Sequence, residues 1–399
     1  MSLRAALAAP LLLAAFVVQA QVPVGLPTTA PAYREGEPFD PAVNLAAPIA
    51  YLIDLGSGQV LFEREPRRRF LPASLTKIMT AYVAFELMQA GRLQPGQRFA
   101  MSDGAFRQWQ RVGSTMFLGR GQVVSVDALL QGIMTVSAND GCIVLAEGAS
   151  GSVAAFVTLM NAEAKRLGMS DSHFGSPNGW PDQGATYTSA RDLAILTRAM
   201  LTRHPAYYRR YVGHPGMTFN GISQHNHVPL FGRVAGADGV KTGFTNESGY
   251  GLVGSAARHG RRLVMVVGGY DRAWQRARES RALLEWGFSA WQTRRLFAAG
   301  ATVGAAKVQG GSAWQVPLIA PLAYYVTYPA GGIAPPVKLT VRYEGPLSAP
   351  LVKGAEVATL RVSTAGEPSR DLPLLVGSST AVAGPLARLR NGLFGLAGL

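Results

Sequence analysis

The chain has 399 residues, 48% of them hydrophobic, which is enough to bury a large core in two or more domains and excludes an intrinsically disordered protein. Its 38 basic and 24 acidic side chains give a formal net charge of +14, which favours anionic partners such as phospholipid or an acidic wall polymer. The single cysteine, Cys142, cannot form an internal disulfide and has apolar neighbours, so we expect a buried thiol.

The N-terminus has the pattern of a secretory signal peptide at residues 1–20. Arg4 precedes an apolar run over residues 5–18, and Ala20 is a small residue suited to the cleavage site. Export makes nucleic acid the least favoured anionic partner, and we expect none. Residues 21–44 are rich in proline, threonine and alanine, which predicts an extended leader.

The next segments predict a hairpin followed mainly by helices. Strands are expected at residues 49–54 and 59–62, and a helix from Ser74 to Ala90, with its apolar residues on one face and Gly91 as its stop. Further helices are predicted at residues 126–134, 142–147, 153–167, 189–201 and 274–286. Further strands are predicted at residues 239–245, which should form a sheet edge, 249–256 and 262–268.

Helical periodicity then gives way to short alternating runs. The runs at residues 337–343 and 357–362, broken by glycine and proline, predict a small β-rich domain at residues 293–378 without catalytic candidates.

Three short groups of residues carry candidate chemistry. Ser74 and Lys77 share one helix face, so a lysine whose pKa is lowered by burial could take the serine proton. Ser137 and Asn139 stand in a predicted connection between helices, where a hydroxyl can relay a proton and an amide can hold a peptide backbone. Taken alone, each spacing is common in proteins of this length.

The third group lies on the predicted edge strand. Lys241 and Thr242 offer a charge and a hydroxyl to a carboxylate, and Gly243 leaves room for a substrate against the backbone.

The groups occur in the order S-x-x-K, S-x-N and K-T-G, with spacings of 63 and 104 residues. With the flanking residues 137–142, 188–193 and 241–245, the chain resembles the low-molecular-mass penicillin-binding proteins that act as D-alanyl-D-alanine carboxypeptidases, of peptidase family S11. The resemblance is strong over residues 43–290. It implies an α/β (α+β) fold: a β-lactamase/DD-peptidase-like domain at residues 45–292, with an antiparallel sheet flanked by helices, and then a small all-β domain.

The resemblance also implies catalytic roles. Ser74 would be the nucleophile of a serine-type D-Ala-D-Ala carboxypeptidase that trims peptidoglycan pentapeptides and so limits cross-linking of the cell wall. Lys77 would activate it, and Ser137 would pass a proton to the departing D-alanine. No metal or other cofactor is implied.

Substrate-binding roles follow in the same way. Asn139 would help to hold Lys77 and the stem peptide, and Lys241 and Thr242 would bind the terminal carboxylate. The backbone N–H groups of Ser74 and Phe244 would form the oxyanion hole. β-Lactams would acylate the same serine.

The residues after S-x-N also bear on the other activities of this fold. A class A β-lactamase needs a glutamate in an E-x-x-x-N segment after S-x-N, and neither Glu147 nor Glu163 has asparagine four residues later, so penicillin is expected to acylate Ser74 and stay. A DD-endopeptidase, or a penicillin-recognising sensor without turnover, stays open.

The histidines of residues 220–227 have two interpretations. His227 falls where some relatives have arginine, so it could bind the carboxylate in a pH-dependent way, but an inert loop histidine explains it equally well. His225 and His227 without a third ligand are weak evidence for a metal.

The last segment, residues 379–399, is predicted to form an amphipathic tail. The apolar residues of its final part share one helical arc, which suits a membrane interface: Leu386, Leu389, Leu393, Phe394 and Leu396. Three glycines disfavour the helix, and a frayed tail is the alternative. The protein is therefore expected in the periplasm, attached by this tail to the outer face of the inner membrane.

Overall fold

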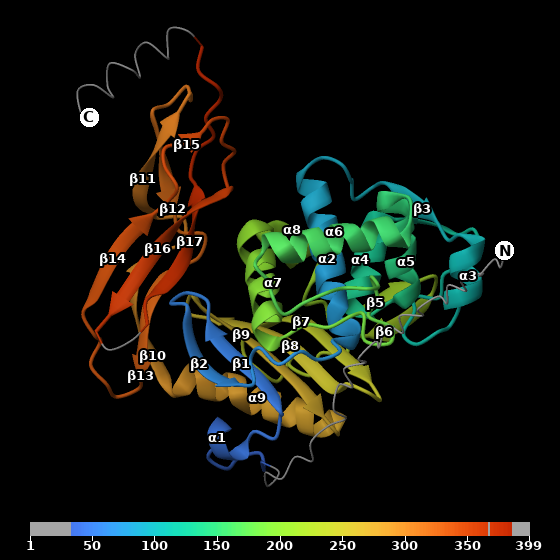
Figure 1. The fold of residues 1–399 in the computed structure, drawn as a ribbon. Helices are drawn as coiled ribbons and strands as arrows, with labels where there is room; N and C mark the ends of the chain where they lie inside the picture. The colour runs from blue at the N-terminus through green and yellow to red at the C-terminus, as the bar shows by residue number, and fades with distance from the viewer. Residues whose placement is uncertain (1–32, 366–367, 385–399) are drawn as a thin grey trace, which may run out of the picture.

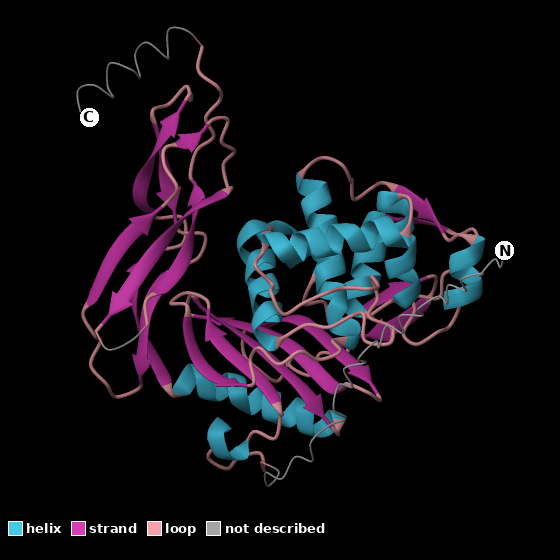
Figure 2. Cartoon of the chain, in the orientation of Figure 1, coloured by secondary structure: helices cyan, strands magenta, loops and turns pink. Residues whose placement is uncertain are grey.

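The structure is a computed structural model that describes residues 33–365 and 368–384 (Figure 1). A first domain of helices around a sheet is followed by a narrower domain made of strands (Figure 2). The predicted signal peptide, and residues 385–399 of the predicted tail, lie outside the described residues.

The first domain is built on a five-stranded antiparallel sheet. The strands run in the spatial order β2-β1-β9-β8-β7, which leaves β7 at an edge. Their bounds are β1 (Ile49–Asp54), β2 (Gln59–Arg64), β7 (Ala237–Thr245), β8 (Gly249–Arg258) and β9 (Arg261–Tyr270). The predicted hairpin and edge strand are confirmed, and so is the α/β class with an antiparallel sheet.

Helices cover both faces of this sheet (Figure 2). Helix α9 (Ala273–Ser289) packs on one face against β8 and β9, where Leu252, Leu283 and Leu284 share a buried cluster. The other face carries a layer of helices: α2 (Lys77–Gln89), α4 (Val126–Thr135), α5 (Asn139–Ser150), α6 (Val153–Arg166), α7 (Ala190–Arg203) and α8 (Pro205–Tyr211). Serine side chains cap α4, α6 and α7 by accepting a backbone N–H of the first turn.

Two helix predictions need correction. Helix α5 begins at Asn139, three residues before the predicted start, because the Asn139 N–H finds an acceptor in the Ser114 carbonyl, 2.8 Å away. Helix α2 has no solvent-facing side, since eleven of its thirteen residues are buried. Its polar Thr80 donates to the Pro177 carbonyl, so a loop covers the polar side of the helix, which the apolar pattern predicted to face solvent.

Several short elements were not predicted. The leader expected to be extended contains α1 (Pro41–Asn44), which starts at the Asp40 cap with proline in the first turn. Others are α3 (Asp103–Trp109), α8, the antiparallel pair β3 (Arg98–Ala100) and β4 (Val123–Ser125), whose connection contains α3, and the hairpin of β5 (Gly216–Phe219) with β6 (Ile222–His225).

The second domain is all-β, as predicted. Strand β10 (Trp291–Phe297) pairs with β13 (Tyr324–Pro329), and six strands form a sheet in the order β14-β16-β17-β12-β11-β15. Their bounds are β11 (Thr302–Gln309), β12 (Gln315–Ile319), β14 (Val337–Arg342), β15 (Leu347–Ser348), β16 (Glu356–Thr364) and β17 (Arg370–Val376). Alternate residues of β16 enter the core, as its sequence pattern predicts.

Buried polar contacts join the two domains. The Arg261 guanidinium pairs with the buried Asp54 carboxylate at 2.5 Å, and the Thr327 hydroxyl of β13 lies 3.3 Å from the same carboxylate. The Tyr325 N–H donates to the Gly56 carbonyl in the β1–β2 turn. The second domain is therefore fixed to the far end of the first sheet rather than tethered only by the chain.

Across residues 33–365 and 368–384, no single helix is both long and apolar enough to cross a membrane. Helices α5 and α6 meet that length and composition only as a pair, bent by 88°.

Candidate active site

A cleft of about 520 Å³ opens between the helical layer and the edge strand β7. All three predicted groups contribute to its walls, and the loop at residues 113–114, the loop at 178–180 and the start of α9 complete it. Its lining residues are Ala73, Ser74, Gly113, Ser114, Ser137, Asn139, Asn178, Gly179, Trp180, His227, Thr242, Gly243, Phe244, Thr245, Tyr250, Ala273 and Arg276.

Ser74 and Lys77 lie at the bottom of this cleft. A 3₁₀ turn at Ala73–Thr76 runs directly into α2, so Ser74 and Lys77 fall on one side of the same turn. The Lys77 Nζ lies 2.7 Å from the Ser74 Oγ. Ser74 is partly exposed to the cleft, whereas Lys77 is fully buried.

The Lys77 amine is surrounded by acceptors. Besides Ser74, it donates to the Asn139 Oδ1 at 2.8 Å and to the Asn178 carbonyl at 2.7 Å. Burial lowers the pKa of Lys77 to about 8, although Cys142 and Asp140 oppose the shift. A substantial part of Lys77 is therefore the neutral amine near pH 8, which can accept a proton from Ser74.

Ser137 reaches the cleft from the junction of α4 and α5. Its backbone has a φ of +64°, a conformation that few residues other than glycine adopt and that recurs at active sites. The residue is 3% exposed and lines the same cavity as Ser74. This placement suits a hydroxyl that passes a proton within the cleft.

Asn139 is held from two sides. Its Oδ1 accepts from Lys77, and its Nδ2 donates to the Val112 carbonyl at 2.9 Å, which leaves one N–H for a substrate. The neighbouring Asp140 carboxylate accepts the backbone N–H groups of Met116 and Leu118, both at 3.0 Å. Asp140 thus fixes the loop that forms one wall, a role that no local sequence pattern predicts.

The strand β7 presents two faces to the cleft. Gly243 faces the Ser74 turn: a Cβ there would lie 2.7 Å from the Pro72 carbonyl oxygen, so only glycine allows this approach. Lys241 shares that face by strand alternation. It is 2% exposed, and burial, with the nearby Lys77 charge, lowers its pKa well below the usual value. Thr242 and Phe244 lie on the opposite face, toward α9.

Arg276 of α9 is a cleft residue that the sequence analysis missed. It is 8% exposed, its Nε has no hydrogen-bond partner among the described residues, and burial lowers the pKa of the guanidinium. It lies 35 residues beyond Lys241, on a helix that the sequence analysis predicted without assigning any functional residue to it. No local sequence signal marks it, because the tertiary fold alone brings it to β7.

His227 also lines the cleft, at its exposed rim. Partial burial, with Lys241 and Arg276 nearby, lowers the pKa of His227 below its usual value. The ring is therefore neutral at pH 7 and can contribute a hydrogen bond there, but no charge.

Cys142 is fully buried in α5, and burial raises the pKa of its thiol to about 12. The expectation of a buried thiol is confirmed.

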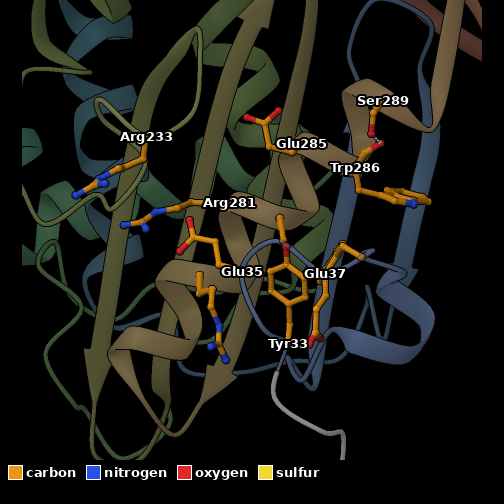
Figure 3. A pocket seen from close by; sticks show the side chains of 11 residues that line it. Tyr33, Glu35, Glu37, Arg233, Arg281, Glu285, Trp286 and Ser289 are labelled. Carbon is orange, nitrogen blue, oxygen red and sulfur yellow. Dashed lines mark hydrogen bonds between the residues drawn. The ribbon is translucent and has the colours of Figure 1, made fainter.

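A second hollow, of about 320 Å³, lies between residues 33–39 and helix α9 (Figure 3). Arginine and glutamate side chains such as Arg281 and Glu285 surround it, and its one serine, Ser289, has no lysine beside it. It offers no counterpart of the Ser74–Lys77 pair.

In the described part of the chain, no group of three or more His, Cys, Asp or Glu side chains is placed to hold a metal ion.

The packing of Gly179 against the Ser74 turn makes a testable prediction. A Cβ on Gly179 would lie 1.9 Å from the Ala73 carbonyl oxygen, so Gly179→Ala must displace either the loop or the residue before Ser74. We expect acylation by labelled penicillin to slow by about 100-fold, since small misplacements of reacting groups have effects of this size.

Gly184→Ala is the matched control for that experiment. Gly184 has a similar positive φ of +88° in the same loop, but nothing lies within 4 Å of its Cβ position. It should lose about 1 kcal/mol of stability and keep its acylation rate. Equal rates for the two variants would contradict the proposed packing.

Comparison with known proteins agrees with this arrangement. A family model described as D-alanyl-D-alanine carboxypeptidase, of peptidase family S11, matches residues 35–271, and a model of the C-terminal domain of penicillin-binding protein 5 matches residues 291–381. The D-alanyl-D-alanine carboxypeptidase DacA of Escherichia coli is 36% identical over 329 residues, which cover 82% of this chain and 81% of that protein.

Solved structures show the same relationship. The crystal structure of penicillin-binding protein 5 from Haemophilus influenzae superposes with a TM-score of 0.66 at 33% identity, over 84% of this chain and 97% of that one. Penicillin-binding protein D2 from Listeria monocytogenes, solved in a cefotaxime-bound form, gives a TM-score of 0.55 at 29% identity, over 61% of this chain and 97% of that one. The chain belongs to the D-alanyl-D-alanine carboxypeptidase family, in its serine-type, penicillin-binding branch.

Proposed function

We propose that this serine-type D-Ala-D-Ala carboxypeptidase uses Ser74 as its nucleophile and the neutral amine of Lys77 as the base. The observation that carries the proposal is the 2.7 Å contact between Lys77 Nζ and Ser74 Oγ, made by a lysine buried deeply enough to lower its pKa to about 8. At that pKa about a tenth of the amine is unprotonated at pH 7 and about half at pH 8, so the free base that general-base catalysis requires is present near neutral pH and predominates above pH 8.

Acylation follows from this pair. The Ser74 Oγ attacks the carbonyl of the D-Ala–D-Ala bond while its proton passes to Lys77. The backbone N–H groups of Ser74 and Phe244 stabilise the oxyanion, a contribution that typically amounts to about 3 kcal/mol per donor. Ser137 delivers its proton to the amine of the departing D-alanine as the C–N bond breaks, and it takes up in exchange the proton held by Lys77, which becomes neutral again. An acyl ester on Ser74 is left.

Recognition of a chain end falls to the charged side of the cleft. The Thr242 hydroxyl, the Arg276 guanidinium and the protonated form of Lys241 would bind the terminal carboxylate of the substrate. Thr242 and Arg276 line the cleft, whereas Lys241 is buried and donates to the Thr242 carbonyl at 3.0 Å. Asn139 would hold the peptide backbone with its remaining N–H. A site that holds a free carboxylate in this way acts on the last peptide bond of a stem peptide.

Hydrolysis of the penicilloyl ester on Ser74 is expected to be much slower than in a class A β-lactamase. Among the cleft-lining residues no glutamate or aspartate stands ready to activate water for a rapid attack on the ester. The loop at residues 176–180 contributes the Asn178 carbonyl, which accepts from Lys77 at 2.7 Å. β-Lactams are therefore expected to acylate Ser74 and remain attached.

The sequence supports further proposals about location. We propose a processed signal peptide at residues 1–20, a catalytic domain at 45–292, a β-rich domain at 293–378 and a membrane-surface tail at 379–399. Together they would place the protein in the periplasm, on the outer face of the inner membrane, with access to peptidoglycan stem peptides.

Release of D-alanine from diacetyl-Lys-D-Ala-D-Ala tests the proposed function. We expect steady release by the full mature chain and loss of release after pretreatment with penicillin. A cross-linked muropeptide dimer measured in parallel should be cut far more slowly. Penicillin labelling without D-alanine release would contradict the carboxypeptidase, and cleavage of the dimer alone would indicate an endopeptidase.

A further inference from the structure

Arg276 is a buried cation without an acidic partner. No aspartate or glutamate of the described residues lies within ion-pair distance of it, although it is only 8% exposed. A buried charge normally needs a partner or a set of hydrogen bonds, because its removal from water is costly. Something else in the structure must therefore hold the guanidinium in place.

An aromatic stack occupies that position. Phe244 and Tyr250 are directly opposed on β7 and β8, and their rings stack with centroids 4.1 Å apart at an interplanar angle of 24°. The pairing of β8 with β9 is irregular between Tyr250 and Leu252, and such bulges re-aim side chains near active sites. The Arg276 Cζ lies 5.7 Å from the centroid of the Tyr250 ring. Since Phe244 covers one face of Tyr250, the guanidinium lies against the other.

The two ways of holding an arginine differ in what they leave for a ligand. A carboxylate partner would neutralise the charge and compete with the substrate for the same N–H groups. An aromatic face attracts the cation without accepting its strong hydrogen bonds. The stack thus orients Arg276 and leaves its donors available at the wall formed by Thr242 and Thr245.

We propose that Tyr250, backed by Phe244, is a positioning residue that keeps Arg276 unpaired at the cleft and thereby sets the selectivity for substrates with a free terminal carboxylate. The inference rests on the proposed function, in which Arg276 binds that carboxylate. Tyr250 itself is given no part in proton transfer.

The test compares acylation of the full mature chain by benzylpenicillin and by benzylpenicillin methyl ester, which lacks the carboxylate. The measured quantity is the ratio of the two second-order rate constants. Tyr250→Leu removes the ring, Tyr250→Phe keeps it without the hydroxyl, and Tyr328→Leu is a control at a partly buried tyrosine of the second domain.

We expect Tyr250→Leu to lower the ratio of the free-acid rate constant to the ester rate constant by about tenfold, because the free acid reacts more slowly. A tenfold change corresponds to the loss of one oriented cation–π contact. The ester rate should change little, which also shows that the variant folds. Tyr250→Phe and Tyr328→Leu should keep the wild-type ratio.

Three results would overturn the inference. Equal slowing of both probes by Tyr250→Leu would indicate a merely structural role, and an unchanged ratio would show that the ring does not position Arg276. A loss in Tyr250→Phe as large as in Tyr250→Leu would assign the effect to the hydroxyl. If the wild type were not acylated by either probe, the proposed function itself would fail, which separates that outcome from the other three.

Discussion

Replacing Ser74 by alanine is expected to lower kcat/KM for D-alanine release by about four orders of magnitude, because the variant has no group that can form the acyl ester. The substitution removes one oxygen from a partly exposed side chain in the 3₁₀ turn that precedes α2. Folding should therefore be preserved, and the thermal unfolding midpoint should stay within a few degrees of the wild type. The measurement is D-alanine release under single-turnover and steady-state conditions.

Ser114→Ala is a suitable control for that variant. Ser114 lines the same cleft, but only its backbone carbonyl is used, as the acceptor for Asn139. It should retain most of the activity. Residual release by Ser74→Ala at more than about one-hundredth of the wild-type rate would exclude Ser74 as the nucleophile.

Lys77→Met is expected to slow acylation by about three orders of magnitude, in keeping with the loss of a general base.

The wild type should also show a characteristic pH dependence. Burial lowers the pKa of Lys77 to about 8, so below that pH the amine is protonated and cannot accept the Ser74 proton. The acylation rate constant should therefore rise about tenfold per pH unit toward pH 8 and level off above it.

Two variants decide whether Lys77 is the source of that pH dependence. Lys77→Arg keeps a cation that does not deprotonate in this range, so it should be nearly inactive and lack the rise. Lys165→Met removes an exposed lysine from the last turn of α6 and should leave the profile unchanged. A rise through pH 8 that persists in Lys77→Arg would assign it to another group, such as the buried Lys241.

The elements that the sequence predicted share a strong local pattern. The β1–β2 hairpin consists of two largely apolar runs on either side of a glycine-rich turn, and α4 has regularly spaced apolar residues that face the core. Helix α3 and the β5–β6 hairpin were missed because they are short, polar and largely exposed, so packing against the rest of the domain determines them more than their own pattern does. Helix α2 differs from its prediction in another way: its polar Lys77 and Thr80 are buried, and both donate to carbonyls of the distant loop at residues 177–178.

The site residues also fall into those that a local sequence pattern predicts and those that only tertiary contacts determine. Ser74 and Lys77 could be paired from their spacing, because three residues along one turn fix their relative position. The meeting of that pair with Ser137 and β7 came only from a resemblance to a family, and the structure gathers these residues around one cleft. The support given by Asp140 and the arrival of Arg276 could not be predicted, because both depend on contacts between segments far apart in the sequence.

The most direct test of the account is to locate the covalent label after reaction of the mature chain with benzylpenicillin. Cleavage after Arg69 and Lys77 gives the peptide Phe70–Lys77, in which Ser74 and Thr76 are the only hydroxyl groups. We predict that tandem mass spectrometry finds one penicilloyl group on this peptide, at Ser74, and none on the Ser74→Ala protein. A label on Thr76, on Ser137 or elsewhere, or a label that persists in Ser74→Ala, would contradict the central claim.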